Sequence, residues 1–73
     1  MKYFSIETSK KGDVVSSAIF DRGDNLEEAK TVLYGVIASN RTAVEQGTND
    51  SCMCMLINEQ GGVEVKGEYY EKA

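Results

Sequence analysis

The sequence predicts an α+β domain, a two-layer ββαββ arrangement in which one helix covers one face of a four-stranded antiparallel sheet. Two patterns support this prediction. Four runs of residues have β propensity, and between the second and third runs the apolar residues recur with helical spacing. The 73 residues are expected to form a single domain, residues 1–73. Its core is thin, because a chain of this size buries only about 60% of its unfolded surface.

The first part of the chain predicts a β-hairpin. Residues 2–8 form the expected first strand and residues 14–20 the second, both rich in β-branched and aromatic side chains. The polar connection between them, residues 9–13, contains the Gly and Asp that hairpin turns favour. Because side chains alternate along a strand, Val15 and Ile19 lie on the same face of the second strand.

The helix is expected to begin near Asn25. Either Asp24 with Glu27 or Asn25 with Glu28 supplies the spacing of a capping box, and acidic residues in the first turn suit the positive end of the helix dipole. The apolar residues that follow occupy an arc roughly 140° wide on a helical projection. These residues are Leu26, Ala29, Val32, Leu33, Val36 and Ile37.

The end of the helix has two solutions in the sequence. Asn40 tolerates the left-handed conformation of a helix cap, so the helix can stop at residues 39–40. However, Ala43 and Val44 return to the apolar face, so the helix can also continue to Gln46 with Gly47 as its cap.

The last third of the chain predicts a second hairpin. Residues 52–57 are apolar on both faces, which is typical of a strand buried on both sides. Residues 58–62 form the turn, and residues 63–71 alternate so that Tyr70 lies on the face opposite Val65. The strand order 2-1-3-4 makes every neighbouring pair of strands antiparallel and places the third strand inside the sheet.

One helix covers only one face of such a sheet, so the second face is expected to expose apolar side chains. Exposed apolar patches beyond a few hundred Å² usually mark an interface, and the simplest partner is a second copy related by two-fold symmetry. The alternative is that the methionines of the third strand are half-exposed on a small monomer. The residues expected at the interface are Val15, Ile19, Met53, Met55, Ile57 and Tyr70.

The composition argues against enzymatic and metal chemistry. The chain has no His, which is the usual general base at neutral pH and the commonest metal ligand. Cys52 and Cys54 could supply only half of the four ligands that structural zinc needs, unless a dimer brought two pairs together. We therefore expect reduced cysteines that act as small buried apolar residues, in a protein that is not an enzyme and uses no metal and no cofactor.

Charge and hydropathy predict a cytoplasmic protein that does not bind membranes, and they argue against nucleic-acid binding. The net charge is −4, whereas nonspecific nucleic-acid binding needs a basic surface. Charged residues appear too early for a signal peptide, and no apolar run approaches the roughly 20 residues of a membrane span. The tripeptide of residues 22–24, Arg-Gly-Asp, is interpreted as a turn that leads into the helix cap.

Several segments resemble a group of short proteins encoded by bacteriophages and prophages of Gram-positive gut bacteria. These segments are residues 1–8 (MKYFSIET), residues 28–30 leading to Tyr34, and the hairpin of residues 56–61 with residues 69–70 (Tyr-Tyr). The resemblance implies a small ββαββ protein of mobile-element origin with an undefined function. It assigns a role to no individual residue.

These observations lead to three functional hypotheses. The first is a noncatalytic, homodimeric interaction module that binds a host or phage protein. The second is a small structural or accessory protein whose only partner is itself. The third is a sheet that binds single-stranded nucleic acid by stacking bases on aromatic side chains; the acidic charge and the absence of Arg or Lys beside the aromatic residues weigh against it.

Overall fold

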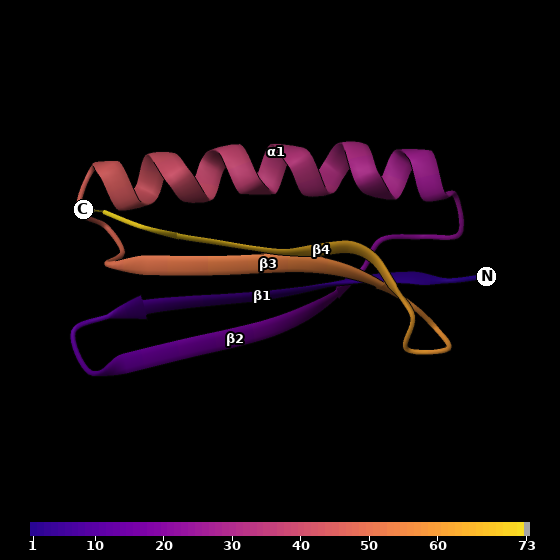
Figure 1. Ribbon diagram of the computed structural model, residues 1–73, viewed down its shortest axis with the longest axis horizontal. Helices are drawn as coiled ribbons and strands as arrows, with labels where there is room; N and C mark the ends of the chain where they lie inside the picture. The colour runs from indigo at the N-terminus through magenta and orange to yellow at the C-terminus, as the bar shows by residue number, and fades with distance from the viewer. Residues whose placement is uncertain (73) are drawn as a thin grey trace.

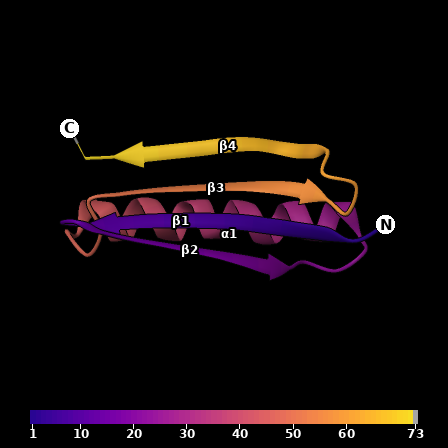
Figure 2. The same ribbon diagram turned by 90° about the horizontal axis from the view of Figure 1, so that it is seen from below.

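The strands and the helix follow one another in the predicted order (Figure 1). The computed structural model describes residues 1–72. The elements are β1 (Tyr3–Lys11), β2 (Val14–Asp21), α1 (Leu26–Glu45), β3 (Ser51–Asn58) and β4 (Val63–Glu71). The strands form one antiparallel sheet in the order β2-β1-β3-β4, which confirms the predicted order. Figure 2 views the molecule with the sheet in front, and the helix lies behind the strands as a second layer.

The β1–β2 hairpin is tighter than the sequence predicted. Its strands pair without a bulge from Phe4 opposite Asp21 to Lys11 opposite Val14, so the loop is only two residues long instead of residues 9–13. Gly12, the first residue of this loop, has a φ of +59°. A two-residue hairpin loop of this type needs a positive φ at its first residue, which glycine adopts without strain.

The helix resolves both alternatives that the sequence left open. At its start, the Asn25 side chain accepts a hydrogen bond from the backbone N–H of Glu28 at 3.1 Å, so Asn25 is the cap. At its end, the helix takes the longer solution, with Gln46 as the C-cap residue and Gly47 in the left-handed region at φ +80°. The apolar face therefore extends as far as the buried Val44.

The core lies between α1 and the middle of the sheet. Ala29 and Leu33 of the helix pack against Cys54 and Leu56 of β3, and all four side chains are buried. Val32, at the rim of the predicted apolar arc, stays 45% exposed. The interior position of β3 is confirmed, since β1 and β4 flank it on either side.

β4 does not follow the uninterrupted alternation that its sequence predicts. Its pairing with β3 shifts register twice. Cys54 lies opposite Glu68, Leu56 lies opposite Val65, and Ile57 lies opposite Val63. Each shift inserts one extra residue into β4, which is the definition of a β-bulge. A bulge exchanges the two faces of the strand beyond it, because side chains alternate with a period of two.

Candidate functional site

The sheet face that the helix leaves uncovered, here called the open face, carries an apolar surface. Its side chains are identified by the strand pairing, because directly opposed residues share a face. Ile6 of β1 lies opposite both Ile19 of β2 and Met55 of β3, and Phe4 lies opposite Ile57. The first set forms an apolar row across three strands, and the second forms an apolar pair across two.

Five of the six residues predicted for the interface lie on the open face. They are Val15, Ile19, Met53, Met55 and Ile57. Val15 and Ile19 are each 67% exposed, whereas the three residues of the interior strand are half-buried among their neighbours. The register also adds Phe4 and Ile6, whose alternation along the first strand is visible in the sequence.

β4 extends the open face to the other edge of the sheet. Tyr69 lies opposite Met53, and Val63 lies opposite Ile57. Both β4 side chains are more than half exposed, at 60% and 59%. A Cβ placed on Gly67 would lie 3.2 Å from the Met53 sulfur, so the methionine side chain lies over the backbone of β4 at this glycine.

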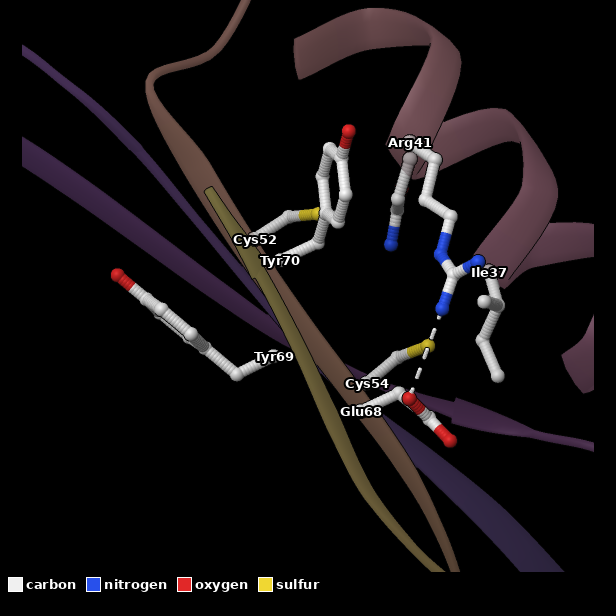
Figure 3. Close-up of a pocket in the computed structure, with 8 residues that line it drawn as sticks. Ile37, Arg41, Cys52, Cys54, Glu68, Tyr69 and Tyr70 are labelled. Atoms are coloured by element: carbon white, nitrogen blue, oxygen red, sulfur yellow. Dashed lines mark ion pairs between the residues drawn. The ribbon is translucent and has the colours of Figure 1, made fainter. Parts of the chain in front are cut away.

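The prediction that Tyr70 lies on the open face is wrong, because the bulge between Val65 and Glu68 places this residue on the helix side of the sheet. Tyr70 lies opposite the buried Cys52, and its hydroxyl donates a hydrogen bond to the Glu45 carboxylate at the end of α1. This bond raises the pKa of the Tyr70 phenol, because the neighbouring carboxylate favours the protonated form. Figure 3 shows Tyr69 and Tyr70 pointing to opposite sides of the strand. The tyrosine of the open face is therefore Tyr69.

A small polar pocket lies between the second half of α1 and the neighbouring strands (Figure 3). The guanidinium of Arg41 lies 5.5 Å from the centre of the Tyr70 ring and 3.8 Å from the Glu68 carboxylate. The cavity measures about 10 Å³, which corresponds to about one water molecule. The pocket is therefore too small for a substrate. The contacts of Arg41 around it connect the helix to β4.

The two cysteines beside this pocket are buried, as the sequence predicts. Burial raises the pKa of both thiols, and with the added effect of the Glu7 carboxylate it raises that of Cys54 to about 11. The thiolate is the nucleophilic and metal-binding form of cysteine. Both thiols are therefore protonated at neutral pH, and their surroundings do not activate them.

A second polar cluster, formed by Ser5, Glu7 and Arg22, lies on the helix side of β1. Arg22 donates hydrogen bonds of 2.9 Å to both the Glu7 carboxylate and the Ser5 hydroxyl, and its guanidinium lies 4.9 Å from the centre of the Phe20 ring. Arg22 is thus occupied within the fold, in agreement with the turn interpretation of residues 22–24. This cluster could not be predicted from the sequence, because it depends on the register of β1.

Other site classes find no support among residues 1–72. No group of three or more His, Cys, Asp or Glu side chains in this range lies close enough to hold a metal ion. The one helix of the described chain is not apolar enough to cross a membrane. Comparison of the chain with protein-family models, curated proteins and solved structures found no match. The open face is therefore the candidate site that the geometry supports best.

Proposed function

We propose that this chain is a noncatalytic protein-interaction module that forms a homodimer through the open face of its sheet. One observation carries the proposal: the uncovered face is apolar across all four strands, from Val15 and Ile19 on β2 to Val63 and Tyr69 on β4. Apolar surface of this kind gains free energy when a partner removes it from water.

The chemistry of the face suits packing against another sheet. It carries aliphatic, aromatic and methionine side chains with the uncharged Thr8 and Ser17 among them, while charged residues such as Lys10 and Asp21 lie toward the ends of the strands. Sheets stack about 10 Å apart with interdigitating side chains, and the flexible Met53 and Met55 adapt to an opposing surface. A second copy of the same face provides a partner of matching polarity.

The proposal includes a cytoplasmic location and a further protein partner of the host or phage. The free cysteines support a reducing compartment. The runner-up is an accessory protein whose only partner is itself. The first hypothesis requires a second surface that binds another protein, whereas the runner-up does not. The acidic start of α1, with Glu27 and Glu28, is exposed and could serve as that surface.

The experiment is a measurement of solution mass by light scattering under reducing conditions, on the wild type and two variants. Met55→Lys places a charge in the middle of the open face, and Val32→Lys places the same charge at an exposed apolar position of α1. The expected masses are a monomer for Met55→Lys and an assembly for the wild type and Val32→Lys. A monomeric wild type, or an assembly that survives Met55→Lys with the fold intact, would refute self-association through this face.

A further inference from the structure

β2 is an edge strand that nothing in the described chain covers. All eight of its residues are exposed, and α1 packs against β3, β4 and β1 but not against β2 within residues 1–72. A helix about 10 Å wide cannot span four strands spaced about 4.8 Å apart. In Figure 2, β2 forms the margin of the sheet opposite β4. One edge of the sheet is therefore free along its whole length.

The two edges of the sheet differ in the features that normally prevent strand-to-strand association. β4 is interrupted by two bulges and carries several charged side chains, both of which are recognised protections of an edge. β2 pairs with β1 without a bulge, and residues 14–20, Val-Val-Ser-Ser-Ala-Ile-Phe, contain no charge, no Pro and no Gly. A flat, uncharged and apolar edge of this kind is a template for another strand.

The backbone groups available at this edge follow from the pairing with β1. The N–H of Arg22 donates to the carbonyl of Tyr3 at 2.8 Å, so this pair belongs to the hydrogen-bonded set of the antiparallel ladder. Such pairs alternate along the strand. The backbone N–H and C=O groups of Val15, Ser17 and Ile19 are therefore directed away from β1 and toward solvent.

We propose that β2 pairs antiparallel with β2 of a second copy, about a two-fold axis at Ser17. This register uses the three outward-directed residues of both strands and forms about six backbone hydrogen bonds. The side chains are self-complementary over seven residues, since each apolar residue meets an apolar or small partner and no charge meets a charge. The cross-strand pairs are Val14–Phe20, Val15–Ile19, Ser16–Ala18 and Ser17–Ser17.

The edge contact joins the sheets of two chains into one sheet of eight strands. Both helices then lie on the same face, and the two open faces become continuous, with Val15 of each chain beside Ile19 of the other. The contact is isologous and each chain has only one unprotected edge, so the pairing stops at two chains. If the open faces also stack as in the proposed function, the two contacts form a tetramer with 222 symmetry where their two-fold axes cross at right angles.

Disulfide trapping tests the register. The Cα atoms of a hydrogen-bonded antiparallel pair are about 5.5 Å apart, which lies within the range that a disulfide spans. We expect Ser17→Cys to form a covalent dimer under mild oxidation, at a yield at least tenfold above that of Ser39→Cys, a matched exposed serine on α1. The native cysteines do not compete, because both are buried. Equal yields from the two variants would overturn the register.

The trapping is repeated in the Met55→Lys background, because Ser17 also lies on the open face and could be reached by face-to-face packing. Cross-linking that persists in this background supports the edge contact even if the face contact fails. Cross-linking that disappears there assigns the trapped disulfide to the face contact and overturns the edge proposal. The two proposals therefore fail separately.

Amide hydrogen exchange tests the backbone pairing directly. In an isolated chain the amides of Val15, Ser17 and Ile19 face water and exchange fast, while those of Ser16 and Ala18 are held by β1. Edge pairing is expected to slow the three outward amides about tenfold or more. Ser17→Pro removes an outward N–H without removing a bond to β1, so it should restore fast exchange at Val15 and Ile19. Fast exchange at these amides in the assembled wild type would overturn the proposal.

Discussion

Replacing Ile19 by Lys is expected to separate self-association from folding, because Ile19 lies on the open face and also on the free edge. Its side chain is 67% exposed in the single chain, so the substitution should change the stability of the monomer by no more than about 0.5 kcal/mol. In the assembly this exposed part is buried. Full burial of an Ile side chain contributes about 1.5–3 kcal/mol, so two-thirds of it contributes about 1–2 kcal/mol per chain.

Two-fold symmetry counts this loss twice, giving about 2–4 kcal/mol per dimer and a Kd raised roughly 30- to 1000-fold. The assay is light scattering across a dilution series, combined with thermal unfolding followed by circular dichroism at a concentration where both proteins are monomers. The reasoning would be refuted by an unchanged dissociation midpoint. It would equally be refuted by a large loss of monomer stability, which would show that Ile19 supports the fold of the single chain.

Three further predictions concern the fold and its titrating groups. Leu33→Ala, at a fully buried position, should lower the free energy of unfolding by about 2–5 kcal/mol in urea titration, and a loss below 1 kcal/mol would contradict the core described above. Asp50 accepts a hydrogen bond from the N–H of Gly12 at 2.7 Å, which lowers the pKa of its carboxyl. Its stabilising effect is therefore complete above the unfolded pKa of about 3.9 and is lost as the pH falls through the lower folded value. Asp50→Asn should therefore reduce the loss of unfolding free energy that occurs on acidification. An unchanged loss in the variant would count against this bond. Because the pKa of Cys54 is raised to about 11, a thiol reagent at pH 8 should label it only after unfolding; rapid labelling of the native protein would show that the thiol is accessible or ionised.

The strand order could be predicted because the elements permit few arrangements. Short hairpin connections join β1 to β2 and β3 to β4, and β3 is apolar on both faces, which favours an interior position. Antiparallel pairing of all neighbours then gives β2-β1-β3-β4. The helix start was narrowed to two capping residues but not decided, since Asp24 and Asn25 satisfy the same rule and only the geometry of the turn selects Asn25.

The position of Tyr70 could not be predicted from alternation alone. The alternation of β4 is uninterrupted in the sequence, yet one inserted residue between Val65 and Glu68 exchanges its faces, so that Tyr70 lies on the same side as Val65. Gly67 is the one local signal, because an isolated glycine within a strand often marks a bulge. The number of strands that one helix covers likewise depends on the width of the helix and the spacing of the strands, not on the order of apolar residues in the sequence. The exposure of β2 on both faces was therefore found only in the structure.

The central claim is that the apolar open face joins copies of this chain, and the most direct measurement is the solution mass of the wild type under reducing conditions, with and without a chelator. The account predicts a mass of at least two chains, unaffected by chelation and reduced to one chain by Met55→Lys. A wild type that stays at 8.0 kDa at high concentration would contradict it.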